Sequence, residues 1–208
     1  MSNVQLNMKD SLQQLLDRSR VVVELGCGPN KRADVIGVDA VDLPGVDVVA
    51  DVNQGLPFLP DASVDEVVAN HLLEHLSNLE GMMSEITRVL KPDGICRVYV
   101  PYFSNPHYYS DYTHRTPWGL YTIGYFCKRG WPYSRHVPDF YNQVDIRLIS
   151  QRLVFYSRYR LIRWPKKAVQ LTVNSSLLFQ ELYEEMLAWA IPADGLEIVF
   201  RRPTSSGD

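Results

Sequence analysis

An apolar, β-branched run near the start of the chain opens into two closely spaced glycines, and this transition constrains the fold more than any other feature. The run Val21–Leu25 is followed by Gly26 and Gly28, with Cys27 between them. Valines are typical of a buried strand, whereas glycines tolerate positive φ angles and let the backbone approach a ligand closely. The pattern therefore predicts a strand that leads into a ligand-binding loop.

A second apolar run, Val35–Val38, ends on the carboxylate of Asp39. In an open α/β sheet, a carboxylate at the tip of the second strand can accept hydrogen bonds from both hydroxyls of a ribose. The two runs together predict a site for a ligand that carries a nucleoside.

Five short motifs between Val21 and Pro101 occur in an order that resembles the class I S-adenosylmethionine-dependent methyltransferases. A single G-x-G motif is common by chance, whereas five motifs in the right order, each at the end of an expected strand or helix, are specific. The motifs are Glu24–Pro29 (E-L-G-C-G-P), Gly37–Ala40 (G-V-D-A), Val48–Val52 (V-V-A-D-V), Val64–Leu76 (V-D-E-V-V-A-N-H-L-L-E-H-L) and Val89–Gly94 (V-L-K-P-D-G).

The resemblance implies a fold and a cofactor. The fold is an α/β, doubly wound, mostly parallel seven-stranded sheet, the Rossmann-like methyltransferase fold, whose last strand inserts antiparallel between strands five and six. The cofactor is S-adenosyl-L-methionine. One departure is that the third glycine of the dinucleotide fingerprint is missing and that Gly28 and Val35 lie too close for a full crossover helix. We therefore expect a reduced first crossover helix, no more than a turn.

Alternating hydrophobic patterns along the rest of the chain are typical of a parallel sheet with crossover helices. Lys91–Gly94 is expected to end the long helix that precedes it. The expected strands are 46–50, 64–69, 95–100, 144–156 and 196–200, and the expected helices are 6–20, 72–90 with an interruption near 77–81, 116–126 and 177–190.

The chain length of 208 residues suits one domain, so we expect residues 1–208 to form a single methyltransferase domain. Segment 102–141 is dense in tyrosine, histidine, proline and tryptophan. Such segments cover active sites more often than they form cores, and we expect an aromatic-rich lid or insertion on the acceptor side. The tail 204–208 is polar.

The composition of the chain limits the kinds of molecule that it is expected to bind. The net charge of −3 argues against a dedicated nucleic-acid binder, and three scattered cysteines indicate a reducing compartment. The chain shows no long apolar run and no signal-peptide profile. We expect a soluble cytoplasmic protein with a small-molecule acceptor and without a membrane partner; the oligomeric state stays open.

The resemblance assigns roles to the residues that follow the first two strands. It implies that Glu24 lies near the methionine end of the cofactor, that Gly26 and Gly28 let the main chain approach it, and that Asp39 binds the ribose hydroxyls. Cys27, inside this loop, is expected to be a small packed residue rather than a reactive thiol.

Residues after the next two strands complete the cofactor site that the resemblance implies. Asp51 and the backbone of Val52 would contact the adenine, while Asn70 and His71 would line the methionine and the methyl group. Each acid could instead cap a loop, and this alternative is strongest for Asp51.

Candidate catalytic residues lie in the segment that follows the fifth strand. Methyl transfer requires a nucleophile aligned within about 3–3.5 Å of the methyl group, and a base only where the acceptor holds a proton at neutral pH. His107 and His114 are candidate general bases, and Asp111 can orient one of them. The alternative is that both histidines hydrogen-bond loop backbone.

His71–His75 also matches H-x-x-E-H, a signature of zinc proteases. That signature needs a third ligand from a helix further along the chain. Because the run lies where the methyltransferase order places the segment after strand four, we expect no metal here.

The stretch Arg152–Lys167 mixes basic and aromatic residues and contains no acid. It can bind an anionic acceptor or nucleic acid, or it can be an edge strand kept soluble by its charge.

From these features we expect methyl transfer from S-adenosylmethionine to an oxygen or nitrogen of a small polar metabolite, such as a sugar or nucleotide-sugar. Two alternatives remain: a methyltransferase-like binding or scaffold subunit without chemistry, and a methyltransferase that acts on RNA or protein.

Overall fold

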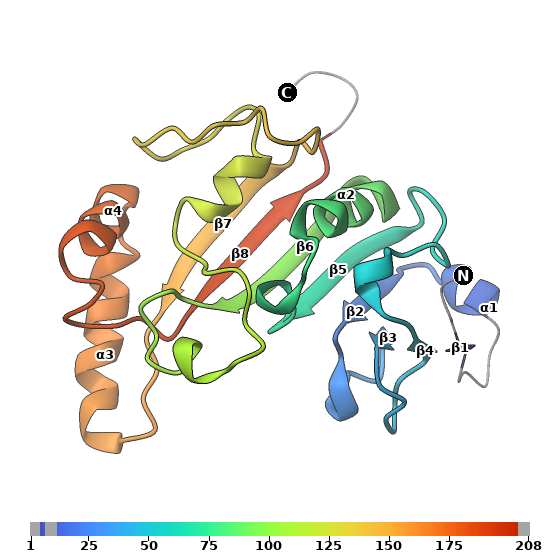
Figure 1. Cartoon of the computed structure of the whole chain (residues 1–208), viewed down its shortest axis with the longest axis horizontal. Helices are drawn as coiled ribbons and strands as arrows, with labels where there is room; N and C mark the ends of the chain where they lie inside the picture. Colours follow the sequence, from blue (N-terminus) through green and yellow to red (C-terminus); the bar gives the residue numbers. More distant parts are fainter. Residues whose placement is uncertain (1–4, 7–11, 204–208) are drawn as a thin grey trace.

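The computed structural model describes residues 5–6 and 12–203. Its centre is an eight-stranded sheet with the order β1-β4-β3-β2-β5-β6-β8-β7 (Figure 1). The strands are β1 (Gln5–Leu6), β2 (Val22–Leu25), β3 (Ile36–Asp39), β4 (Val48–Val49), β5 (Val64–Asn70), β6 (Leu90–Pro101), β7 (Arg147–Val154) and β8 (Gly195–Arg201).

The strand order reverses at β2, which pairs in parallel with both β3 and β5. At the other end, β8 pairs antiparallel with β6 and with β7 and lies between them. The short β1 adds an antiparallel edge to β4. Without β1, the seven strands follow the predicted doubly wound order, with the last strand antiparallel, so the predicted fold class is confirmed.

Four α-helices and five short 3₁₀ helices connect the described strands. None of these helices is long and apolar enough to cross a lipid bilayer. They are α1 (Leu12–Leu16), η1 (Gly28–Asn30), η2 (Val52–Gln54), η3 (Leu73–His75), α2 (Leu79–Val89), η4 (Tyr108–Ser110), η5 (Thr122–Phe126), α3 (Arg160–Val173) and α4 (Leu177–Met186).

Two features of the first crossovers agree with the sequence predictions. The chain between β2 and β3 forms only the three-residue η1, as the short interval requires. The helix expected over 72–90 is interrupted where predicted, because η3 ends at His75 and α2 begins at Leu79. The Asn78 side chain accepts a hydrogen bond from the Gly81 amide and so caps the start of α2.

Three predicted elements were wrong in extent. The helix expected over 116–126 is only the five-residue η5. The long helix ends before 91–94, as expected, but the strand expected at 95–100 begins already at Leu90, so residues 91–94 belong to β6. The first expected helix, 6–20, is reduced to α1, because Leu6 lies in β1 and residues 17–20 are not helical; residues 7–11 and the polar tail 204–208 fall outside the described part of the chain.

The interpretation of Arg152–Lys167 as an edge strand was wrong for most of its length. β7 is the edge strand and contains only Arg152 of the basic residues, whereas four others lie on α3. Pro165 lies inside α3. An interior proline removes a backbone donor and argues against a helix, so the sequence pattern gave no helical signal here.

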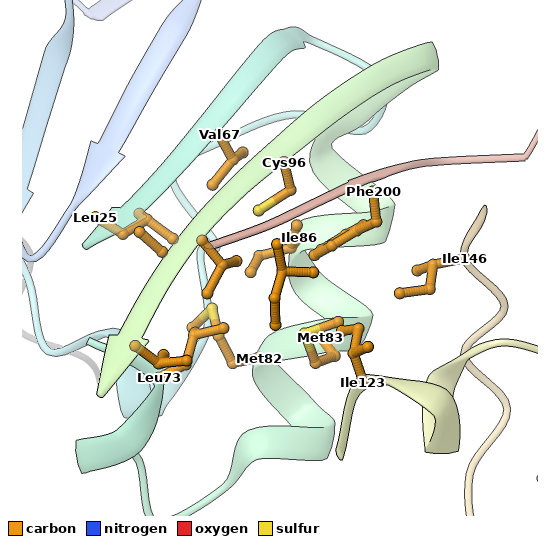
Figure 2. Packing of buried hydrophobic residues seen from close by; sticks show 14 of the residues in the cluster. Leu25, Val67, Leu73, Met82, Met83, Ile86, Cys96, Ile123, Ile146 and Phe200 are labelled. Carbon is orange, nitrogen blue, oxygen red and sulfur yellow. The ribbon is translucent and has the colours of Figure 1, made fainter. Parts of the chain in front are cut away.

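The core forms where α2 packs on the central strands (Figure 2). Met83 and Ile86 of α2 point toward Val67, Cys96 and Phe200 of the sheet, and all five side chains are fully buried. This packing supports the central strands, whose carboxyl ends carry the residues described below.

Candidate functional site

The carboxyl ends of β2, β3 and β5 meet at one edge of the sheet. The last residue of β2 lies level with Val38 of β3 and Ala69 of β5. Gly26, Asp39 and Asn70 therefore come next at the same edge. Because the strand order reverses here, this is the place where open α/β sheets bind their ligands.

The two glycines of the loop have different tasks. Gly26 adopts φ +66°, and a Cβ there would lie 3.1 Å from Cδ1 of Leu72. Gly28 adopts φ +55°, but a Cβ there would meet open space. Gly26 thus permits close packing under the loop, while Gly28 keeps the backbone accessible at the surface of the site.

Asp39 organises this loop. Its Oδ2 accepts a hydrogen bond of 2.9 Å from the Gly28 amide, and its Oδ1 accepts one of 3.0 Å from the Val41 amide. Each carboxylate oxygen has two lone pairs, so both oxygens can accept a further hydrogen bond. Asp39 therefore holds the glycine loop and can still bind two ligand hydroxyls.

Glu24 carries an unpartnered acceptor. Its Oε2 is buried and, among the described residues, has no hydrogen-bond partner. Buried carboxylate oxygens are nearly always paired, so an orphaned one beside a ligand edge indicates a place for a cation or a hydroxyl. An ammonium group of a ligand would satisfy it.

Cys27 is a packed residue, as expected. Burial, together with the nearby carboxylates of Asp39 and Glu24, raises the pKa of its thiol to about 11. A Cβ at Gly37 would lie 2.8 Å from the Cys27 sulfur, which shows how closely the thiol packs on β3. A neutral, packed thiol is a poor nucleophile.

Asp51 and Val52 occupy the turn after β4. The Asp51 side chain accepts a hydrogen bond of 3.0 Å from the Asn53 amide and caps η2. The capping interpretation of Asp51 therefore describes its contacts. Val52 is buried, and the Ala50 amide donates to the Asp39 carbonyl, which brings this turn close to the end of β3.

Asn70 and His71 are exposed at the end of β5. His71 has φ +52°, an unusual backbone conformation for a residue other than glycine, and such conformations cluster at functional sites. Its Nδ1 lies 3.3 Å from Oε1 of Glu74, and that carboxylate raises the pKa of the imidazole above its ordinary value.

The three candidate catalytic residues do not form one group. Asp111 and His114 lie together, with 3.7 Å between Oδ2 and Nε2. The Nδ1 of His114 lies 2.8 Å from the Tyr108 carbonyl oxygen, so this ring also holds loop backbone. His107 instead lines a hollow of about 390 Å³, together with Arg158, Lys166 and Asp194 among others.

Tyr99 connects this hollow with the end of β5, which the sequence patterns did not reveal. Its hydroxyl donates to Oδ2 of Asp194 at 3.0 Å, and its ring lies 4.9 Å from that of His71. Burial, reinforced by Asp194, raises the pKa of Tyr99 far above its usual range. The only available signal was the position of Tyr99 near the end of an expected strand.

The arrangement defines a class: a Rossmann-like methyltransferase fold with a ligand edge at the strand-order reversal. A solved complex between the Haloferax volcanii Trm112 methyltransferase activator and a methyltransferase resembles the chain with a TM-score of 0.53 and 16% identity, over 94% of this chain and 90% of that one. At this identity, the likeness concerns the fold.

Sequence comparison finds methyltransferases that resemble part of the chain. Residues 23–98 match the family model of a methyltransferase domain. A probable S-adenosylmethionine-dependent methyltransferase of Mycolicibacterium smegmatis is 38% identical over 98 residues, which cover 39% of this chain and 38% of the relative. A trans-aconitate 2-methyltransferase of Azoarcus sp. is 28% identical over 107 residues, 41% of each chain.

The chain thus spans about two fifths of the length of these curated relatives. Residues 23–98 thus match a methyltransferase domain in sequence, and the sheet has the methyltransferase topology that the motif order predicted; several of the relatives are named as dependent on S-adenosylmethionine.

Proposed function

We propose that this chain transfers a methyl group from S-adenosylmethionine to an oxygen or nitrogen of a small polar metabolite that carries an anionic group. The observation that carries the proposal is the strand-end edge, where Glu24, Gly28 and Asp39 offer an orphaned carboxylate oxygen, an open backbone and free lone pairs. S-adenosylmethionine supplies a methyl group already activated by its sulfonium.

The residues at this edge fit the parts of the cofactor. Glu24 binds the methionine ammonium with its unpaired oxygen, and Asp39 accepts hydrogen bonds from the ribose hydroxyls. Asn70 and His71, exposed at the end of β5, line the methionine and the methyl group.

The turn after β4 binds the adenine base of the cofactor. Asp51 shapes it by capping η2, and the backbone of Val52 faces the base. The fit of these residues to an adenosyl sulfonium supports the proposed cofactor site.

The acceptor site that we propose is the hollow lined by His107, Arg158 and Lys166. Two cationic side chains favour an anionic acceptor, such as a carboxylic acid or the diphosphate of a nucleotide-sugar. The Azoarcus relative is named for methylating trans-aconitate, which supports a small acid. His107 is the base where the accepting atom carries a proton.

Segment 102–141 acts as the lid of this site within one domain. It is anchored to the turn after β5, because the amides of Arg115 and Thr116 donate to the Glu74 carbonyl at 2.7 and 3.1 Å. This anchoring supports the position of the lid beside the methyl-donor edge.

Incubating the purified chain with methyl-labelled S-adenosylmethionine and a metabolite extract tests the activity. We expect the label in a small anionic compound. Label found only in RNA or protein would reject the proposed acceptor class. No heat of binding and no thermal stabilisation at millimolar S-adenosylmethionine would instead support the scaffold alternative.

Reversing one charge tests the acceptor hollow. We expect Arg158→Glu to raise the KM for the identified acceptor at least about tenfold, because an anion loses an ion pair of about 1.4 kcal/mol or more. Lys167→Glu is the matched control, since Lys167 also belongs to the basic part of α3 but lines a different hollow. Equal KM values for both variants would place the acceptor elsewhere.

A pair of alanine variants separates the folding and binding roles of the glycine loop. Both Gly26→Ala and Gly28→Ala carry a penalty of about 1 kcal/mol for positive φ, but only the first also crowds Leu72. We expect the larger drop in melting temperature for Gly26→Ala. We expect Gly28→Ala to weaken S-adenosylmethionine binding measured by calorimetry, and unchanged affinity would mean that no ligand approaches this backbone.

A further inference from the structure

A carboxylate and two imidazoles converge beside the end of β5, outside the cofactor edge described above. Glu74 and His75 come from η3, and His114 comes from segment 102–141. One potential ligand atom from each of the three residues lies within 4.8 Å of the other two. This distance allows one ion to contact all three.

The carboxylate at the centre of this cluster is unusual. Glu74 is fully buried, and within the described parts of the chain neither of its side-chain oxygens has a hydrogen-bond partner. The nearby His71 and His75 nitrogens lie 3.3 and 3.9 Å from Oε1, without hydrogen-bond geometry. Burying a carboxylate without hydrogen bonds is costly, and the imidazole of His71 approaches only one of its two oxygens, so this side chain has room for a further cationic partner.

Hydrogen bonds orient both imidazoles for ligation. The Nδ1 of His114 donates to the Tyr108 carbonyl oxygen, which leaves its Nε2 lone pair free. The Thr113 hydroxyl donates to Asp111 and therefore accepts from Nδ1 of His75. These bonds assign the same tautomer to both rings, and metal-bound histidines are held in this way by carbonyl or carboxylate partners.

We infer that Glu74, His75 and His114 form a binding site for a divalent transition-metal ion, for which zinc is the best match. Two imidazoles and one carboxylate are the protein ligands of open zinc sites, whereas magnesium prefers oxygen ligands alone. The His114 and His75 side chains are 9% and 31% exposed, so the remaining coordination position opens on the His75 side.

The sequence expectation of no metal rested on the place of His71–His75 in the methyltransferase motif order and on the need for a third ligand from a later helix. The structure brings that ligand from a loop instead, because the backbone bonds between Glu74 and residues 115–116 hold His114 against η3. The metal site joins the turn after β5 to the lid. It also makes His114 a ligand, which leaves His107 as the base.

Zinc titration of the full chain tests the site directly. After removal of metals with a chelator, the protein competes with a chromogenic zinc indicator. We expect one zinc ion per chain, and affinities about tenfold to a hundredfold weaker for Glu74→Gln and for His114→Gln. The control His136→Gln removes an exposed histidine outside the cluster and is expected to bind zinc like the unaltered chain.

Thermal denaturation gives a second readout. We expect zinc to raise the melting temperature of the unaltered chain and of His136→Gln, but not of the two ligand variants. Binding that is unchanged in both ligand variants, or no zinc bound to the unaltered chain, would overturn the inference. Calorimetry with S-adenosylmethionine on the same samples reports correct folding and keeps this result separate from a failure of the proposed function.

Discussion

Replacing Asp39 with alanine is expected to weaken S-adenosylmethionine binding about tenfold to a hundredfold, or about 1.4–2.8 kcal/mol. The variant removes the acceptor that we propose for the ribose hydroxyls, and it also releases the Gly28 and Val41 amides that shape the loop. Titration calorimetry measures the change.

Two further variants serve as controls for the predicted effect of Asp39→Ala. Asp34→Ala removes an exposed acid of the same β2–β3 connection that pairs with Arg32 and not with the amides of the glycine loop, and we expect unchanged affinity. Asp39→Asn keeps one oxygen acceptor and should bind more tightly than Asp39→Ala. If Asp39→Ala binds S-adenosylmethionine within about twofold of the affinity of the unaltered chain, Asp39 does not bind the cofactor.

Phe200→Ala is expected to lower the free energy of unfolding by about 3–5 kcal/mol. The ring is fully buried on β8 and lies close to α2 in the core (Figure 2). Removal of the ring leaves a cavity between α2 and β8, the strand that pairs with both β6 and β7. For a chain of this size, each kcal/mol lowers the melting temperature by about 2–4 °C.

The matched control for this substitution is Phe140→Ala, since the Phe140 side chain is 72% exposed. We expect its melting temperature to stay close to that of the unaltered chain. A Phe200→Ala variant that melts together with the Phe140→Ala control would show that β8 is not packed as described.

The shared edge of β2, β3 and β5 could be predicted because its signals are local. A β-branched run that ends at a glycine pair indicates the end of a strand, and Asp39 follows a second such run. The short interval before Val35 limits the first crossover to a turn, as η1 confirms. The topology followed from the order of these motifs.

The elements that sequence patterns missed depend on contacts between distant segments. α3 contains Pro165, a residue that argues against a helix, and Leu161 and Trp164 are 92% and 81% exposed, so the sequence analysis did not predict this helix. The approach of His114 to Glu74 depends on the fold of the lid, because backbone bonds from residues 115 and 116 to Glu74 and the Thr113–His75 hydrogen bond bring them together. No spacing along the chain encodes such a contact.

A crystal structure of the chain with bound S-adenosylhomocysteine tests most directly whether the ends of β2, β3 and β5 form the cofactor site. We predict ribose hydroxyls within hydrogen-bond distance of the Asp39 carboxylate, and the ammonium group next to Oε2 of Glu74. A ligand bound at another surface, with Glu24 and Asp39 untouched, would contradict the assignment of this edge.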